Sequence, residues 1–358
     1  KNIKKEKDQE ECLKDWFAIE NNVGEKDLTS FIRYYWMSRN PFTPKNQLYK
    51  SISESKKDAQ ELMKELKSAS QLYKQLTDTS FKFQDLKTST KRSKDLSDTI
   101  NSLKDTALKI GSTQINTFLL SIISIINRRK LKSNPQKFLI LLENFLFQYF
   151  AIGSNPANAV ERKFSSISNL LEKSLADKDK LIEKNQDRLF KTFTSDFKNI
   201  LNQNVNEENF KETFKKLEYV TFSKSRKKYE INKYILEKYE YYLMQSIGKS
   251  TNEIALKLSN LNKEHLLPQK PDKWGLTSKN VESYVNSLGN IFLIDIDLNT
   301  EMSNDTLDKK IKSLKKSSLL SIKEVYHNKE DVKWGKKEIE KRLDKITNAA
   351  WDSIWNID

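Results

Sequence analysis

Cysteine is almost absent from this sequence, because Cys12 is the only thiol among 358 residues. A single cysteine excludes an internal disulfide framework, and it also excludes a zinc site built from four Cys or His ligands. Such a chain fits the reducing interior of a cell, so we expect a cytoplasmic protein.

Glycine and proline are also scarce, with 7 and 6 residues respectively. Because these residues supply many tight turns and helix ends, their rarity predicts long helices. No secretory signal or membrane span is evident, since the most apolar runs, residues 118–126 and 138–152, are too short or contain Glu143. The hydrophobic fraction is only 37%, yet 18 Phe, 13 Tyr and 6 Trp provide material for a core. The sequence therefore predicts a mainly α chain of two or three domains with no membrane partner.

Charge is distributed unevenly along the chain. Of the formal net charge of +15, residues 261–358 contribute +1, which leaves +14 for residues 1–260. A basic surface attracts phosphate backbones whatever their sequence. An alternative explanation is compositional, because Lys is abundant here together with Asn, Ile and Ser, as in proteins from AT-rich genomes. The charge by itself thus favours nucleic-acid binding only weakly.

The most informative stretch begins at Glu264 and ends at Asn299. His265, one of two histidines in the chain, follows Glu264 and precedes an apolar pair and a proline. A Gly-Asn pair ending at Asn290 leads into the β-like run of residues 291–294, and Asn299 follows nine positions after Asn290. This order predicts strand, loop, strand and helix, with the polar groups meeting at one point.

These residue types suit a one-metal phosphodiesterase. A histidine can take a proton from water, oxygen ligands can hold a hard cation, and an asparagine can orient the histidine. The alternative is that a lone histidine in a lysine-rich helical protein is a surface or core residue, and His-x-x-Pro alone is a weak motif. The joint occurrence of His265, Pro268, Gly289, Asn290 and Asn299 in this order favours the phosphodiesterase.

At these residues the sequence resembles the HNH (ββα-metal) nucleases. The Glu-His-Leu-Leu-Pro-Gln opening and the nine-residue step from Asn290 to Asn299 are similar to the HNH domain of CRISPR effector nucleases. A longer context resembles the C-terminal domain of GmrSD-type, modification-dependent restriction endonucleases. That context comprises the Leu-Gly-Asn-Ile segment, the lysines downstream of it, and the ending Trp334, Ile339, Arg342, Trp351 and Trp355.

The resemblance implies a role for each residue of the motif. His265 would be the general base and Asn290 the residue that positions it, whereas Glu264 and Asn299 would be the metal ligands. Asn299 stands where the name of the motif expects histidine, and Glu264 stands where aspartate is common. Both are oxygen donors, so they fit Mg²⁺ or Mn²⁺ better than zinc.

Basic residues after the motif are candidates for contact with DNA. We expect the segment 309–316 to continue the helix of the ββα unit. Its lysines, chiefly Lys309 and Lys310, should contact the DNA backbone. Arg342 falls near the apolar face of the last helix, which is predicted over residues 336–355. This arginine could reach a phosphate or pair with a buried carboxylate, and we favour the phosphate.

The sequence thus predicts a basic α-helical domain over residues 1–255 and a small α+β HNH (ββα-metal) nuclease domain over residues 256–358. The predicted function is divalent-metal-dependent cleavage of DNA, including modified DNA, in prokaryotic type IV restriction and antiviral defence. In GmrSD-like proteins a ParB-like NTPase domain with an Asp-Gly-Gln-Gln-Arg signature precedes these helices, and no such signature occurs in this chain. The resemblance therefore implies either a ParB-like NTPase domain or subunit as a partner or the loss of nucleotide control. The alternative is a non-catalytic nucleic-acid-binding or helical scaffold module that partners such an NTPase.

Overall fold

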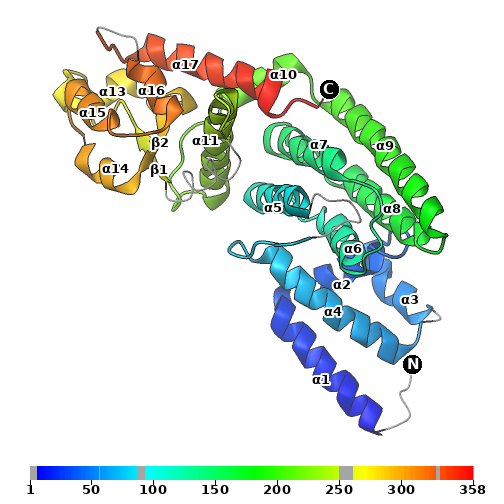
Figure 1. Ribbon diagram of the computed structural model, residues 1–358. Coiled ribbons are helices and arrows are strands. Elements are labelled where there is room, and N and C mark those ends of the chain that lie inside the picture. The colour runs from blue at the N-terminus through cyan, green and yellow to red at the C-terminus, as the bar shows by residue number, and fades with distance from the viewer. Residues whose placement is uncertain are drawn as a thin grey trace. The chain divides into compact units, whose positions relative to one another are not determined.

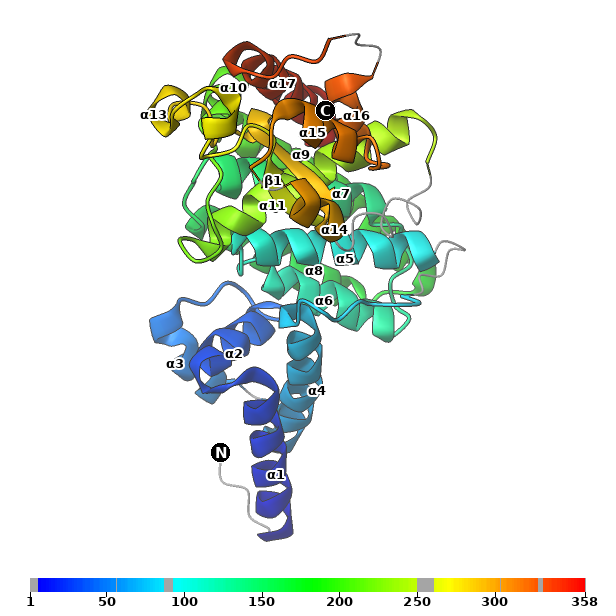
Figure 2. The ribbon, with the colours of Figure 1, turned by 90° about the vertical axis from the view of Figure 1, so that its left-hand side faces the viewer.

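The computed structural model describes residues 6–55, 57–86, 93–249, 261–302, 304–327 and 331–357. These residues are mainly helical, as the sequence predicts, and they contain one two-stranded sheet (Figures 1 and 2). Their contacts divide the chain into two compact units. Unit 1 comprises Lys1–Leu146 and Asn155–Ile200, and unit 2 comprises Phe147–Ser154 and Leu201–Asp358.

The described part of unit 1 consists of helices and the loops between them. Its main helices are α1 (Glu6–Val23), α2 (Leu28–Met37), α3 (Leu48–Ser53), α4 (Ala59–Thr77), α5 (Ser93–Ile110), α6 (Asn116–Asn127), α7 (Gln136–Leu146), α8 (Asn158–Ser174) and most of α9 (Asp179–Asn204). The apolar sequence of α6 is buried on nearly every side, as expected for a helix without a polar face. Helices α2, α4 and α8 pack against it. Phe118 of α6 also meets Phe138 of α7 edge to face, with ring centroids 5.7 Å apart.

The described helices include none that is both long and apolar enough to cross a membrane. The most apolar helix, α6, has 12 residues, whereas a membrane span needs about 20.

Unit 2 contains the sheet. Strands β1 (Leu261–His265) and β2 (Ile291–Asp295) pair antiparallel, with His265 opposite Ile291. The sequence of β2 is β-branched and apolar, and the strand is buried for almost its whole length. Helix α14 (Ile296–Met302) follows β2 directly, so the predicted order of strand, loop, strand and helix is observed.

Six more helices of unit 2 lie in its described part, and all of them except α10 lie around the hairpin (Figure 1). They are α10 (Glu207–Lys215), α11 (Arg226–Ser246), α13 (Ser278–Val281), α15 (Leu307–Leu314), α16 (Leu320–Tyr326) and α17 (Lys336–Ala349). Helix α11 packs against β2, and α17 packs against the turn before β2. One apolar cluster extends from α11 through both strands to α17, so it fixes the hairpin between these two helices.

A π-helical turn over Phe147–Ile152 belongs to unit 2, although α7 before it belongs to unit 1. The Phe147 ring stacks on Trp355 with a centroid distance of 3.8 Å. Gln148 Nε2 also donates a hydrogen bond to the Trp355 carbonyl oxygen at 2.6 Å. These contacts anchor the C-terminal end of the chain, where a second π-helical turn spans Ala350–Ile354.

The segment 309–316 does not continue the helix after β2, so this expectation was wrong. Helix α14 ends at Met302 and α15 starts at Leu307. In the turn between them, the Asp305 carbonyl oxygen accepts a hydrogen bond from Trp274 Nε1 at 2.8 Å. Because the chain turns here, the lysines of this segment lie on a second helix.

The predicted domain boundary at residues 255/256 falls within residues 250–260, which lie outside the described residues. Helices α10 and α11 precede this boundary, yet they pack in unit 2 together with the hairpin. That a nuclease domain starts at residue 256 stays a prediction.

Candidate active site

Strand β1 ends in two adjacent side chains, Glu264 and His265, which point to opposite faces of the hairpin. His265 points into unit 2 and is only 8% exposed. Glu264 points toward α15, where it meets Lys310. The strand therefore presents a potential base and a potential oxygen ligand on its two faces.

The His265 imidazole is held from two sides. Its Nε2 atom lies 3.1 Å from Asn286 Oδ1, and Gln269 Nε2 donates to the same oxygen at 2.8 Å. The Tyr219 ring packs edge to face against the imidazole, with centroids 4.4 Å apart. An oxygen acceptor at Nε2 assigns the imidazole proton to that atom and leaves Nδ1 as the basic nitrogen.

Burial lowers the pKa of His265 from 6.5 to about 4, although the hydrogen bond with Asn286 opposes the shift. The nearby ammonium groups of Lys310 and Lys263 lower the pKa further. His265 is therefore neutral at pH 7, the form that can accept a proton, and the same burial makes its imidazole a weaker base than an exposed histidine.

This shift predicts a pH-dependent stability of the metal-free protein. Between pH 4 and 6.5 the unfolded chain binds more protons at His265 than the folded protein does. The stabilisation is complete above pH 6.5 and is lost as the pH falls toward 4, by up to about 3 kcal/mol from this residue. Urea unfolding in EDTA at a series of pH values measures the effect.

A His265→Gln variant is the reference for that experiment. Burial raises the pKa of the neighbouring Glu264, so this carboxylate changes stability with pH in the opposite direction. The difference in unfolding free energy between wild type and His265→Gln removes the Glu264 contribution. A difference that does not change between pH 4 and 6.5 would contradict the lowered pKa.

Lys310 is buried beneath the end of β1. Its Nζ atom lies 3.3 Å from Glu264 Oε1 and donates a hydrogen bond to the His265 carbonyl oxygen at 2.8 Å. The side chain is 0% exposed. Burial raises the pKa of Glu264 and lowers that of Lys310, in each case against the attraction of its partner. The expected contact of Lys310 with DNA is therefore corrected, because its ammonium group instead holds the end of β1.

Asn290 makes its hydrogen bonds to the chain around His265 and not to the imidazole. Its Oδ1 atom accepts from Leu267 N at 2.9 Å and from Trp334 Nε1 at 3.0 Å. Its Nδ2 atom donates to the carbonyl oxygens of Leu267 and Val285, both at 2.8 Å. Both donors and both acceptor positions are thus engaged. Asn290 positions His265 only indirectly, through the loop after β1, which corrects the expected direct contact.

Replacing the two asparagines should separate their roles. Asn290→Ala leaves several buried partners without a hydrogen bond and should lower the unfolding free energy by about 3 kcal/mol or more. Asn286 is half-buried, so Asn286→Ala should cost about 1 kcal/mol. Urea unfolding at pH 7 measures both, and equal losses would contradict this division of roles.

Arg342 is buried, contrary to the expected contact with a phosphate. Its Nη1 atom lies 3.1, 2.9 and 2.9 Å from the carbonyl oxygens of Leu288, Gly289 and Ile291. Its guanidinium carbon lies 3.6 Å from the Phe292 ring centroid. Burial lowers the pKa of Arg342 to about 10. The residue therefore joins α17 to the turn that carries the motif asparagine, which corrects the expectation.

Glu264 is the described residue of the motif that suits a hard cation. The other expected ligand, Asn299, falls within the bounds of α14, and its side chain lies outside the described residues. In the described ranges, no group of three or more His, Cys, Asp or Glu side chains is placed to hold a metal ion. A single carboxylate fits Mg²⁺, because this ion keeps several waters and is commonly bound by one or two carboxylates with substrate phosphates.

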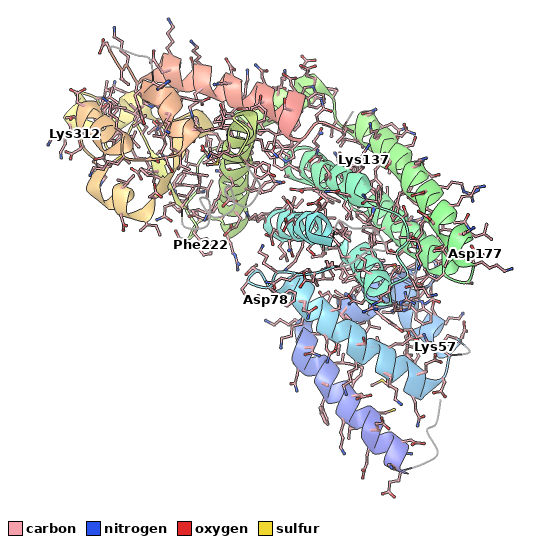
Figure 3. The ribbon with its side chains drawn as sticks, in the orientation of Figure 1. Lys57, Asp78, Lys137, Asp177, Phe222 and Lys312 are labelled. Carbon is pink, nitrogen blue, oxygen red and sulfur yellow. The ribbon has the colours of Figure 1, made fainter. Side chains whose placement is uncertain are left out.

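Lys309 is exposed on α15, in contrast to its neighbour Lys310. Its ammonium group lies 3.8 Å from Asp305, which Lys273 also approaches at 2.8 Å. Asp305, Lys309 and Lys312, the last labelled in Figure 3, border a hollow of about 360 Å³. Ammonium groups outnumber the single carboxylate, so the surface attracts anions and Lys309 stays a candidate for contact with DNA.

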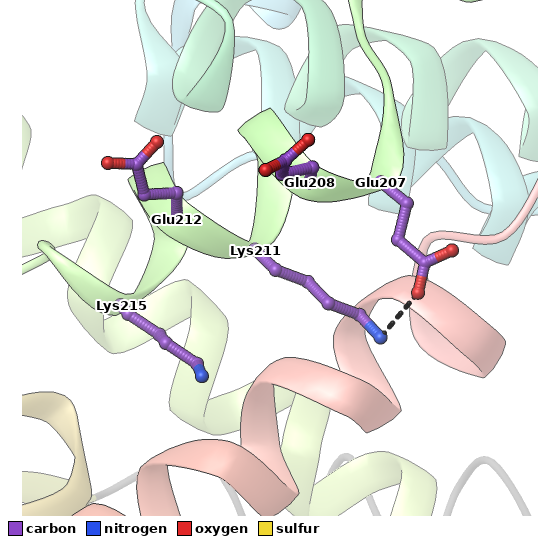
Figure 4. A pocket seen from close by; sticks show the side chains of 5 residues that line it. All are labelled: Glu207, Glu208, Lys211, Glu212 and Lys215. Atoms are coloured by element: carbon purple, nitrogen blue, oxygen red, sulfur yellow. Dashed lines mark ion pairs between the residues drawn. The ribbon is translucent and has the colours of Figure 1, made fainter.

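A second hollow, of about 510 Å³, lies along α10. It is lined by Glu207, Glu208, Lys211, Glu212 and Lys215 (Figure 4). Lys211 pairs with Glu207 at 2.7 Å. Pairs of this spacing stabilise an exposed helix by a few tenths of a kcal/mol. The hollow is thus a solvated helix face, and we assign no chemistry to it.

Three residues at the site were not predicted from the sequence, namely Asn286, Tyr219 and Lys263. Lys263 lies on the same face of β1 as His265, and its Nζ atom is 3.6 Å from the Tyr229 ring centroid. Burial lowers the pKa of Lys263 to about 8. Because side chains alternate between the two faces of a strand, the sequence of β1 could have placed Lys263 on the same face as His265. No sequence pattern connects Tyr219 or Asn286 with the histidine.

Comparison with known proteins finds one family model that matches the part of the chain carrying the site. Residues 192–349 match the model of the C-terminal domain of GmrSD restriction endonucleases, a match that covers less than half of the chain. The matched range contains both strands, α14 and all of α17, and with them every predicted site residue. No curated protein matches the chain.

Proposed function

We propose that this chain is a divalent-metal-dependent DNA endonuclease. The premise is that residues 192–349 form a C-terminal domain of the GmrSD restriction endonuclease family. Its role would be prokaryotic restriction of foreign or modified DNA, which places the protein in the cytoplasm. The observation that carries the proposal is that Glu264 and His265 stand next to each other at the end of β1, inside the matched range. The strand, loop, strand and helix order around them supports an HNH (ββα-metal) arrangement.

In this proposal His265 removes a proton from the water that attacks the scissile phosphodiester. Its imidazole is neutral at pH 7, as a general base requires. The Nε2 atom is engaged by Asn286, so Nδ1 would receive the proton. Lys310 holds the His265 carbonyl oxygen, and Asn290 holds the loop after it, which together limit the movement of the base.

Glu264 and Asn299 would hold the cation, for which Mg²⁺ or Mn²⁺ is proposed. When bound, such an ion offsets charge on the scissile phosphate and on the leaving oxygen. Lys309 and its neighbour Lys312 would contact the DNA backbone, since both border the basic hollow beside α15. Lys310 and Arg342 have internal roles in this scheme.

Plasmid nicking by the purified chain tests the proposed function. We expect conversion of supercoiled DNA to nicked or linear forms with Mg²⁺ or Mn²⁺, and no conversion in EDTA. Adding the metal back after EDTA treatment should restore the activity, because a hydrated cation exchanges freely. Binding of DNA without cleavage in any of these metals would refute the nuclease.

The alternative is a non-catalytic nucleic-acid-binding or scaffold module that partners a ParB-like NTPase. Two observations favour it, namely the ion pair between Glu264 and Lys310 and the low exposure of His265. A DNA-binding module would retain an affinity that falls steeply with salt. A scaffold would show weak, salt-insensitive affinity for DNA and tight association with its protein partner.

A further inference from the structure

The segment between α10 and α11, residues 217–225, contacts the site through Tyr219 and is named the strap. It is attached to the loop before β2 by an isolated antiparallel bridge between Glu218 and Ser287. The Tyr219 backbone N–H donates to the Asn286 carbonyl oxygen at 2.6 Å. Asn232 of α11 also holds the strap, through Nδ2 and the Glu218 carbonyl oxygen at 2.6 Å.

Tyr219 brings its ring from the strap onto the side chains of β1. The ring packs edge to face on His265 at 4.4 Å, and the Lys263 ammonium nitrogen lies 5.0 Å from its centroid. Lys263 and His265 share one face of β1 because they are two residues apart. Tyr219 therefore covers that face and accounts for part of the burial of the imidazole, which is 8% exposed.

The exposed part of the strap is held through Phe222, whose ring packs edge to face on Tyr229 with centroids 5.5 Å apart and lies 5.8 Å from the Arg226 guanidinium carbon. Thr221, Phe222, Ser223 and Lys224 are exposed. Phe222, labelled in Figure 3, is a large apolar side chain that remains 53% exposed. Segments with few buried contacts open at a lower free-energy cost than the core to which they attach. The two-residue bridge can thus break while the hairpin and its apolar cluster stay folded.

We propose that residues 217–225 form a strap that shields His265 through Tyr219 and must move away before a substrate phosphodiester can reach the imidazole. Displacing the strap removes the Tyr219 ring from His265, while the Lys263 ammonium group beside it stays hydrogen-bonded to the Tyr229 carbonyl oxygen of α11 at 3.0 Å. The opening requires no rearrangement of β1, because Asn290 and Lys310 hold the strand and its loop independently of the strap. The reference to a substrate rests on the proposed nuclease function, whereas the shielding of His265 does not.

Acylation by diethyl pyrocarbonate tests the shielding on the full chain without any nuclease assay. The chain has two histidines, and the other one, His327, is exposed and serves as an internal reference. Peptide mass spectrometry at pH 7 would follow both. We expect slow acylation of His265 in the wild type and acceleration by about tenfold or more in Tyr219→Ala, with His327 unchanged.

Two matched variants control this result. Tyr219→Phe keeps the covering ring and should leave His265 slow, while Phe222→Ala removes a 53% exposed strap ring that packs on Tyr229 of α11. Circular dichroism and the thermal midpoint verify that each variant is folded. Equal acylation rates of His265 in wild type and Tyr219→Ala would overturn the shielding, as would a wild-type rate equal to that of His327.

A reversible lock tests whether the strap must open. Glu218→Cys and Ser287→Cys, in a Cys12→Ser background, place two thiols across the antiparallel bridge, where paired residues are close enough for a disulfide. In the oxidised protein we expect His265 acylation and DNA cleavage to fall by about tenfold or more, and reduction should restore both. Equal rates in the two redox states would overturn the requirement for opening.

The two measurements separate this inference from the proposed function. If the reduced and wild-type proteins fail to cleave DNA under all metal conditions, the nuclease proposal fails. The acylation rates then still decide whether the strap shields His265 and whether it opens. If cleavage is present but insensitive to the lock, the nuclease stands and the strap is refuted.

Discussion

Gly289→Ala is expected to destabilise unit 2 by about 3 kcal/mol or more, because the backbone of the turn at Gly289 lies directly against the backbone of α17. A Cβ atom on Gly289 would overlap the carbonyl oxygen of Ile339 in α17 and would lie 3.1 Å from Leu343 Cβ. Neither group can move alone, since the turn is also held through Arg342. Urea unfolding followed by circular dichroism and tryptophan fluorescence measures the loss.

Gly335→Ala provides the matched control, because this glycine lies in the same unit just before α17. A Cβ atom there would meet Glu338 Oε2 at 3.6 Å, which is ordinary van der Waals contact. We expect a change below about 1 kcal/mol. If both glycine variants unfold at the same urea concentration as the wild type, the close approach of the turn to α17 is wrong.

His265→Ala is expected to reduce metal-dependent DNA cleavage by about 10²- to 10⁴-fold, the usual contribution of a general base. The fold should persist, since the loop after β1 remains held by Asn290 and Lys310 keeps its contact with the backbone carbonyl. Single-turnover cleavage of a plasmid with Mg²⁺, at saturating protein, separates this loss from a loss of DNA affinity.

His327→Ala is the natural control for that variant. His327 is exposed at the end of α16, so the His327→Ala variant should cleave DNA like the wild type. If His265→Ala retains full activity while EDTA abolishes it, the metal site is real and the base is a different group. If His265→Ala and the wild type bind DNA equally and neither cleaves it, the non-catalytic alternative gains support.

The helical class and the order of elements around the motif were readable from the sequence. The scarcity of Gly and Pro favoured long helices, and the apolar run of residues 118–126, too short to span a membrane, lies in the buried helix α6. The apolar run from Ile291 to Ile294, preceded by a Gly-Asn pair, indicated β2 correctly. These are local patterns, in which a residue and its near neighbours decide the outcome.

The roles of the basic residues depended on the tertiary structure. Lys309 and Lys310 are adjacent in sequence, yet consecutive residues of a helix point about 100° apart, so one is exposed and the other is buried against Glu264. Arg342 lies near the apolar face of α17, as expected, but which group it meets depended on the turn before β2 folding against that helix.

The sequence by itself determined the helical class, the hairpin with its following helix, and the placement of Glu264 and His265 side by side at the end of a strand. Only the tertiary structure decided which asparagine holds the imidazole, which cation stays at the surface, and that Tyr219 covers the base. The physical reason is range. Strand alternation and helix periodicity act between neighbours, whereas these contacts join segments far apart in the chain, whose meeting is set by the packing of α11, the hairpin and α17 around one apolar cluster.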